Sequence, residues 1–125
     1  LRVLFGDYVA ASGTAVINLD SPEAGYLAPR APRRVTFGIT ARAADITIEP
    51  DSIDMSELGI RAAVIDNRKR EVFPLILPMP GLHNLSNALA AIAAASAAGI
   101  GIGHAAYALR SFAGLARRFD VIGTS

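Results

Sequence analysis

Residues 81–91 read GLHNLSNALAA, and this stretch decides how the rest of the chain is interpreted. It predicts a helix that starts with polar side chains and continues, to about residue 98, as an alanine-rich apolar body. Asn84 and Asn87 are three residues apart, and His83 and Asn87 are four apart. All three side chains are therefore predicted to project from one side of the helix.

The segments before this helix predict an α/β fold. Residues 14–19 form a short run with almost no alternation of polar and apolar residues, which indicates a strand buried on both faces. A capping residue, Asp20, and Pro22 predict a helix over about residues 22–28, which leads to a second strand at residues 34–39. Strand, helix and strand together make the unit from which a parallel sheet is built.

An antiparallel β-hairpin appendage is predicted next. Its strands are residues 44–49, 59–65 and 71–77. Residues 66–69 predict a hairpin turn between the last two strands. The alternation in residues 45–49 indicates that the first strand is half-exposed and antiparallel, and residues 51–57 predict a polar loop.

The two ends of the chain predict further elements. Residues 1–10 carry apolar side chains at helical spacing. After the long helix, Gly99 is expected at the C-cap, and a second helix spans about residues 103–112. The glycines between the two helices follow a helix, whereas a phosphate-binding loop follows a strand, so they indicate a helix–helix turn. Residues 117–122 are predicted to enter another strand, and both ends of the chain are expected to be cut from a longer protein.

Composition narrows the functional classes. The chain has 125 residues, 52% of them hydrophobic and only 18% charged, so part of its apolar surface is expected to be covered by further domains. A net charge of +1 gives no electrostatic case for a nucleic-acid partner, and the absence of cysteine excludes disulfides and thiolate sites. The apolar run at residues 88–102 is shorter than the roughly 20 residues of a membrane span, so no membrane association is predicted.

The polar start of the long helix allows two interpretations. The carboxamides of Asn84 and Asn87 match the donor and acceptor on one edge of adenine, so with His83 they could hold a purine. Alternatively, an asparagine here caps the helix N-terminus, although only one residue can occupy the N-cap. His83 is expected to orient a neighbour or stack on a ring. It has no second ligand at metal spacing, so no metal site is predicted, and His104 is expected to be a surface residue.

Other charged residues give weaker signals. Arg117 and Arg118 carry guanidinium forks suited to phosphate oxygens, but they also fit a solvated pair after a helix. The basic residues at 33–34 and 68–70 are interpreted as solvated and receive no role. The acidic residues form no paired-carboxylate signature, and the chain has neither a nucleophile elbow nor a phosphate loop ending in lysine. No catalytic residue is therefore assigned.

Residues 80–91 contain a His-Asn-x-x-Asn-Ala pattern that resembles a motif of the Mur ligase family, the ATP-dependent amino-acid ligases of peptidoglycan precursor synthesis. Three other stretches agree with that family in order and spacing. They are residues 13–20 (GTAVINLD), 35–38 (VTFG) and 112–120 (FAGLARRFD). The resemblance covers essentially the whole chain.

The resemblance implies that residues 1–125 are the second half of the central ATP-binding domain, with a P-loop-type sheet. It implies that His83, Asn84 and Asn87 contact the adenine side of ATP and that Arg118 contacts the nucleotide. The family's phosphate loop, its Mg²⁺ ligands, its carbamylated lysine and its substrate-binding domains have no counterpart in this sequence. ATP, Mg²⁺, a UDP-muramyl substrate and an amino acid or peptide are thus expected of a full-length cytoplasmic enzyme, and the isolated chain is expected to be inactive.

The resemblance leaves the reaction open among several ligases. Residues 117–123 favour the alanine-adding ligase or the related ligase that recycles murein tripeptide, whereas residues 4–20 are equally compatible with the ligase adding the third residue. A folylpolyglutamate or cyanophycin-type ligase of the same superfamily is an alternative. A non-catalytic nucleotide-binding module that keeps the α/β fold is another.

Overall fold

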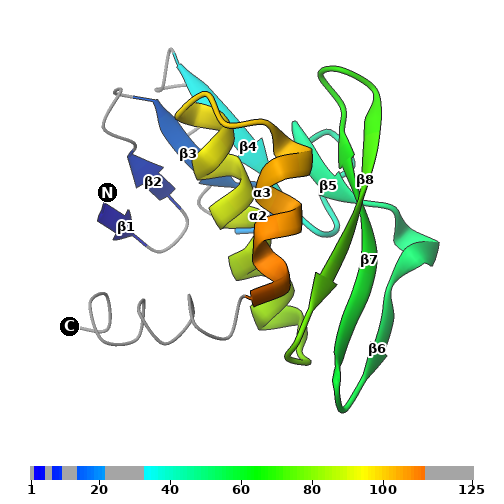
Figure 1. Cartoon of the computed structure of the whole chain (residues 1–125). Helices are drawn as coiled ribbons and strands as arrows, with labels where there is room; N and C mark the ends of the chain where they lie inside the picture. The colour runs from blue at the N-terminus through cyan, green and yellow to red at the C-terminus, as the bar shows by residue number, and fades with distance from the viewer. Residues whose placement is uncertain (1, 5–6, 10–13, 22–32, 112–125) are drawn as a thin grey trace.

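The computed structural model describes residues 2–4, 7–9, 14–21 and 33–111, and these residues form an α/β layer structure (Figure 1). Within them, eight strands belong to one sheet in the order β1-β2-β3-β4-β5-β7-β6, with β8 paired to β7. The strands are β1 (Arg2–Leu4), β2 (Asp7–Val9), β3 (Ala15–Asn18), β4 (Arg34–Phe37), β5 (Ile46–Ile48), β6 (Asp54–Ser56), β7 (Gly59–Asp66) and β8 (Glu71–Leu77). The predicted α/β class with an antiparallel hairpin is confirmed.

The parallel part of the sheet is built from β3 and β4, which pair in register from Ala15 opposite Arg34 to Asn18 opposite Phe37. Val16 and Ile17 are consecutive residues of β3, so their side chains point to opposite faces of the sheet, and both are buried. Both predicted strands are confirmed. The helix predicted over residues 22–28 lies outside the described residues, as does the strand predicted over 117–122.

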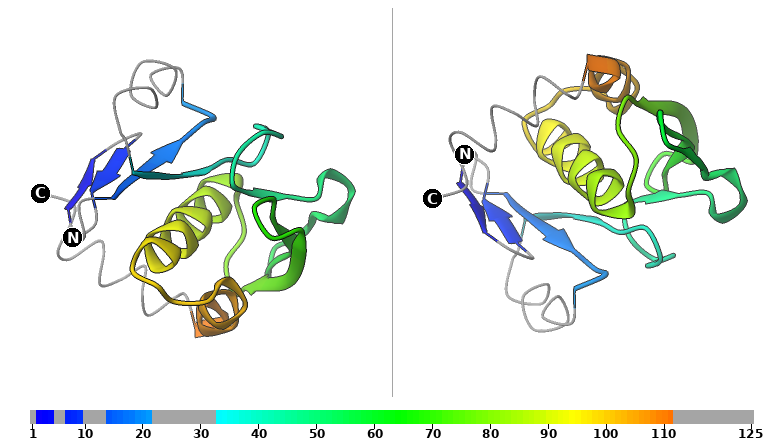
Figure 2. Two further views of the ribbon diagram at one scale, coloured as in Figure 1. Left: turned by 90° about the horizontal axis from the view of Figure 1, so that it is seen from above. Right: turned by 90° about the horizontal axis from the view of Figure 1, so that it is seen from below.

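The antiparallel part centres on β7, a strand of 8 residues. One edge of β7 pairs with β8, and the other pairs with β5 at one end and β6 at the other. The hairpin turn between β7 and β8 is confirmed; within it Arg70 adopts a left-handed conformation, with φ 56°. This long hairpin curls away from the parallel strands, so that the sheet has two sides facing a common interior (Figures 1 and 2).

The interior is filled by α2 (Leu82–Ala97). Seen from above or below, this helix lies between the parallel strands and the β7–β8 hairpin, and α3 (Ile102–Ala108) closes the remaining side (Figure 2). The buried residues of α2 are Leu85, Ala88, Leu89, Ile92, Ala93 and Ala94. The small side chains of these alanines allow α2 to pack closely between the parallel strands and the β7–β8 hairpin.

The two helices were predicted correctly, with shifts at their ends. Gly99, after the end of α2, has φ 88°, a left-handed conformation that favours glycine and ends the helix. The second helix ends earlier than predicted, because a 3₁₀ turn, η3 (Leu109–Ser111), follows α3. Leu109, the first residue of η3, is buried.

Three local predictions were wrong. The helical spacing in residues 1–10 was misleading, because residues 2–4 and 7–9 form strands: β1 and β2 pair with each other, and β2 pairs with the edge of β3, which gives that edge its hydrogen-bond partners. The strand β5 is not half-exposed, since Thr47 is only 2% exposed between β4 and β7. The polar loop at residues 51–57 contains a short 3₁₀ turn, η2 (Pro50–Ser52), and the edge strand β6.

Candidate functional site

The candidate site is the N-terminal end of α2, which begins after Gly81. The backbone of Gly81 has φ 104°, which an L side chain rarely adopts, and its carbonyl oxygen accepts hydrogen bonds from the amides of Asn84 and Leu85. No side chain caps this end of the helix. The asparagines therefore do not act as N-caps, and the capping interpretation of the sequence motif is not what the structure shows.

The structure places the three predicted side chains together on this end. The side-chain nitrogen Nδ2 of Asn87 lies 3.3 Å from Nε2 of His83, one helical turn away. Asn84 donates from Nδ2 to the carbonyl oxygen of Pro80 at 2.7 Å. His83 and Asn87 are exposed, and Asn84 is half-buried. Each carboxamide thus uses one donor within the chain.

The unused hydrogen-bonding capacity of these side chains is what a ligand could use. Among the described contacts, neither the Asn84 nor the Asn87 carboxamide oxygen accepts a hydrogen bond. Leu85, between them on the helix, is fully buried and anchors this turn in the core. The site therefore combines a fixed backbone with free polar atoms, an arrangement suited to reading a planar donor–acceptor edge.

The position of this cluster in the fold agrees with ligand binding. The helix α2 packs against β3, β4 and β5, and it runs opposite in direction to β3 and β4 (Figures 1 and 2). Its N-terminal end therefore points toward the edge where the parallel strands end. In open α/β sheets, ligands bind in the crevice outside the carboxyl ends of the strands.

A second polar group at this edge of the sheet was not identified from the sequence. The carboxylate of Asp20, just after β3, accepts hydrogen bonds from the loop that follows β4: from the amide of Ile39 at 2.6 Å, the amide of Thr40 at 3.1 Å, the Thr40 hydroxyl at 2.7 Å and the amide of Ala41 at 3.1 Å. Partial burial by itself raises the pKa of Asp20, but these hydrogen bonds outweigh it and lower the pKa below the ordinary value of an aspartate.

Other residues singled out in the sequence have different places. Arg118 lies outside the described residues. His104 is exposed on α3, as predicted. Arg68 is not simply solvated: its Nε lies 3.2 Å from the buried carboxylate of Asp66, and its Nη2 donates to Ser96 on α2 at 2.8 Å. This arginine ties the β7–β8 turn to the helix.

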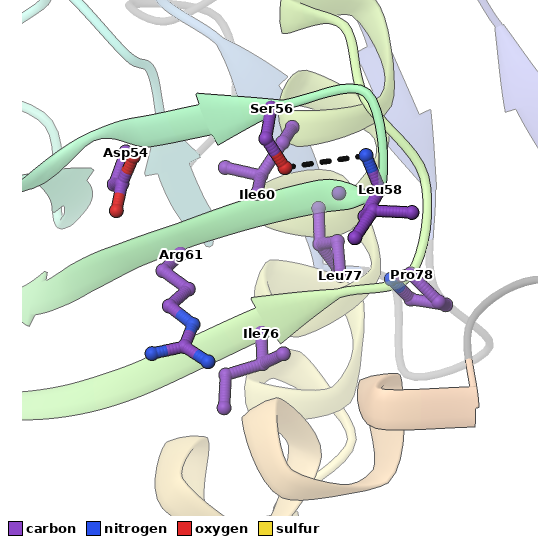
Figure 3. A pocket seen from close by; sticks show the side chains of 9 residues that line it. Asp54, Ser56, Leu58, Ile60, Arg61, Ile76, Leu77 and Pro78 are labelled. Atoms are coloured by element: carbon purple, nitrogen blue, oxygen red, sulfur yellow. Dashed lines mark hydrogen bonds between the residues drawn. The ribbon is translucent and has the colours of Figure 1, made fainter.

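A hollow of about 390 Å³ opens beside the hairpin strands (Figure 3). Its lining combines the apolar side chains of Leu58 and Ile76 with the polar side chains of Asp54 and Arg61. The amide of Leu58 donates to the Ser56 hydroxyl at 3.2 Å and thereby fixes the tight turn at its rim. The hollow contains none of the residues that the sequence motif singled out.

Two further properties concern only the described part of the chain. In it, no group of three histidine, cysteine, aspartate or glutamate side chains is arranged to hold a metal ion. No helix there is long and apolar enough to cross a membrane.

Comparison with known sequences places the chain beside peptidoglycan ligases. It is 38% identical over 112 residues to the UDP-N-acetylmuramate–L-alanine ligase of Xylella fastidiosa (strain M12), covering 89% of the chain and 23% of that enzyme. It is 37% identical over 124 residues to the ligase of the same description from Agrobacterium fabrum, covering 95% of the chain and 26% of that enzyme. The chain thus spans about a quarter of the length of these relatives.

Solved structures of peptidoglycan-precursor ligases share the fold of this chain. The fold matches a UDP-N-acetylmuramoyl-L-alanyl-D-glutamate–2,6-diaminopimelate ligase with a TM-score of 0.68 at 27% identity, over 78% of the chain and 20% of that structure. It matches the Acinetobacter baumannii ligase that adds D-alanyl-D-alanine with a TM-score of 0.67 at 21% identity, over 78% of the chain and 21% of that structure, which concerns the fold alone. The Mur ligase middle domain matches residues 2–95. The chain therefore belongs to the Mur ligase family.

Proposed function

We propose that this chain is part of the central ATP-binding domain of an ATP-dependent ligase that joins L-alanine to the carboxylate of UDP-N-acetylmuramate. The observation that carries this proposal is the similarity to UDP-N-acetylmuramate–L-alanine ligases over 89–95% of the chain. In this reaction the γ-phosphoryl group of ATP moves to the substrate carboxylate and ADP leaves. The amine of the amino acid then attacks the acyl phosphate, and inorganic phosphate leaves as the amide forms. The precursor and ATP place this reaction in the cytoplasm.

We propose that the start of α2 binds the adenine end of ATP. The free carboxamide oxygens of Asn84 and Asn87 can accept from the adenine amino group, and the remaining amide hydrogens can donate to a ring nitrogen. His83 holds Asn87 in place or stacks on the base. Arg118 contacts the nucleotide from the end of the domain, as the family resemblance implies.

The residues present fit one end of ATP. The carboxamides of half-buried Asn84 and exposed Asn87 suit a neutral heterocycle, whereas the described residues offer no cluster of carboxylates or histidines for Mg²⁺. Mg²⁺ would neutralise charge on the transferring phosphoryl group in the complete enzyme, with ligands from elsewhere in the protein. This chain's own contribution is to orient the base and to bury the apolar side of α2 beneath it.

The test of the reaction uses the full-length protein. It is incubated with ATP, Mg²⁺ and UDP-N-acetylmuramate, and with L-alanine, glycine, L-serine or L-glutamate in separate reactions. Formation of the amide is followed by mass spectrometry, and phosphate release is followed in parallel. Amide formation with L-alanine is the expected result. A parallel reaction replaces UDP-N-acetylmuramate by a folate; ligation of glutamate there, with no product from UDP-N-acetylmuramate, would assign the protein to the folylpolyglutamate branch instead.

The isolated chain is proposed to be inactive. It contains no phosphate loop ending in lysine, so it lacks the main group that positions the γ-phosphoryl of ATP in proteins with this type of sheet. The purified chain of 125 residues should therefore release no phosphate from ATP above the rate measured without protein. Measurable ATPase activity that copurifies with the folded chain through two chromatographic steps would contradict this expectation.

A further inference from the structure

The loop after β4 forms a cluster of hydrogen-bond donors that surrounds a single carboxylate. Oδ1 of Asp20 accepts from the amides of Thr40 and Ala41 and from the Thr40 hydroxyl, while Oδ2 accepts from the amide of Ile39. Successive backbone amides that converge in this way form an anion-binding nest. Here the anion is a side chain of the protein itself, supplied by the end of the neighbouring strand β3.

The space around this carboxylate is fitted to it. A Cβ atom on Gly38 would lie 2.9 Å from Oδ1 of Asp20, closer than real Cβ atoms approach their neighbours, and 3.0 Å from the Cβ of Ala41, which is tighter than most real Cβ contacts. The amide of Asp20 donates to Oδ1 of Asn18 at 2.9 Å, which holds the chain in the turn that presents the carboxylate. The sequence Asn-Leu-Asp after β3 and the glycine after β4 thus act together.

The same loop is fixed from its other side by Arg42. This side chain donates to the carbonyl of Ile48 at 2.8 Å and to the Thr47 hydroxyl at 3.1 Å, and it also contacts the carbonyl of Ile39. The side chain of Asn67 in turn donates to the carbonyls of Arg42 and Ala44, directly after the 38–41 loop. The loop therefore has hydrogen-bond partners from β3, β5 and the β7–β8 turn.

The loop is coupled by packing to the start of α2. Ile39 packs against the hydrophobic cluster that contains Phe37, at the end of β4, and Leu85, in the first turn of α2. Leu85 follows Asn84 in the sequence and is fully buried, so the ends of the parallel strands and the first turn of α2 share one apolar core.

We propose that Asp20 is a positioning residue for nucleotide binding: its carboxylate fills the nest of the 38–41 loop, locks the ends of β3 and β4 together, and so fixes the start of α2. This inference rests on the proposed adenine role of Asn84 and Asn87. It assigns Asp20 no contact with the nucleotide. Its contribution is expected in the affinity for ATP and not in the rate of the chemical step.

The test compares Asp20→Ala and Asp20→Asn in the full-length protein. Removal of the carboxylate is expected to raise the KM for ATP about fivefold with kcat within about twofold, in the range of coupling between sites. Formate, added at increasing concentration, is expected to enter the emptied nest of Asp20→Ala and to restore both the KM and the melting temperature. Asp20→Asn should not respond to formate, because its carboxamide fills the nest while presenting a donor to the Ile39 amide.

Matched variants separate the possible outcomes. Asp51→Ala removes an exposed carboxylate in η2 and should leave the KM for ATP and the formate response unchanged. Thr40→Val removes only the hydroxyl donor, so it gives a smaller KM increase even if Asp20→Ala does not fold. A melting temperature lowered without a change in KM would overturn the positioning role, and so would an equal formate response of the wild type. A wild type that binds no ATP would refute the proposed function and, with it, the positioning role. Recovery of the melting temperature of Asp20→Ala by formate would, even in that case, show that the 38–41 loop binds a carboxylate.

Discussion

Two polar clusters near the ends of the parallel strands are held in opposite ways. The carboxylate of Asp20 accepts four hydrogen bonds from the neighbouring loop, so its capacity is used within the chain. Asn84 and Asn87 each make one side-chain hydrogen bond among the described residues, and their oxygens accept none. The first arrangement fixes a loop, whereas the second leaves atoms available to a ligand. Hydrogen-bond saturation therefore separates supporting residues from residues suited to binding.

The largest expected effect tests the unsaturated cluster. Replacement of both Asn84 and Asn87 by Ala in the full-length protein should weaken ATP-analogue binding about 100-fold, because each specific base-edge contact contributes about 1–3 kcal/mol. Stability should change little, because alanine is a good helix former and no cap is lost. Isothermal titration calorimetry measures the affinity, and thermal melting measures the stability.

The matched control for this pair is Ser86→Ala, in the same turn of α2. Ser86 lies between the two asparagines in sequence and takes no part in the cluster, so its replacement should leave the affinity within about twofold. A double asparagine variant that binds nucleotide as tightly as the wild type would remove the adenine role from α2. Unused hydrogen-bonding capacity would then not identify the residues that bind the nucleotide.

The second effect tests the saturated cluster. Gly38→Ala would insert a Cβ atom 2.9 Å from Oδ1 of Asp20, so the free energy of unfolding should fall by about 1–3 kcal/mol, as in other overpacked sites. Gly101→Ala is the matched control, because a Cβ there meets nothing within 4 Å and the backbone φ is −62°. Because Gly101 is the N-cap of α3, where glycine is preferred to alanine, its replacement should cost no more than about 1 kcal/mol. Urea unfolding of the isolated chain measures both, and equal losses would show that the space beside Asp20 is not tight.

Elements of the fold that depend on local sequence patterns could be predicted, whereas those that depend on pairing between distant segments could not. The strand β3 and the helix α2 followed from local patterns, a short apolar run and an alanine-rich periodic segment with a glycine after its end. The start of the chain was mispredicted because its strand character depends on pairing with β3, which no local pattern records.

Some residues near the candidate site could be predicted from the sequence, and others could not. His83, Asn84 and Asn87 could be identified from spacing because they share two turns of one helix. The partners of Asp20 are 19 to 21 residues away in sequence, and the Ser96 partner of Arg68 is 28 away. Such contacts depend on the tertiary fold, so the sequence indicated only a capping role for Asp20 and a solvated turn position for Arg68.

A smaller effect should appear in the pH dependence of stability. The pKa of Asp20 is lower in the folded chain than in the unfolded one, so its carboxylate stabilises the fold above about pH 3.9, and this contribution is lost as the pH falls through the native pKa. The stability difference between wild type and Asp20→Asn should be about 1 kcal/mol near pH 6, limited by solvent exposure, and smaller near pH 3. Urea unfolding at the two pH values measures it. A difference that grows on acidification would contradict the assignment.

The smallest expected effect concerns His83, which has two possible roles. If its ring nitrogen orients Asn87 across the 3.3 Å contact, both His83→Ala and His83→Phe should weaken nucleotide binding about threefold, the lower range for one neutral hydrogen bond. If the ring instead stacks on the base, His83→Phe should retain the affinity and only His83→Ala should lose it. His104→Ala, an exposed histidine on α3, is the control and should bind like the wild type. We expect the first pattern, because the contact with Asn87 already exists without a ligand, and calorimetry on the three variants distinguishes it from the second.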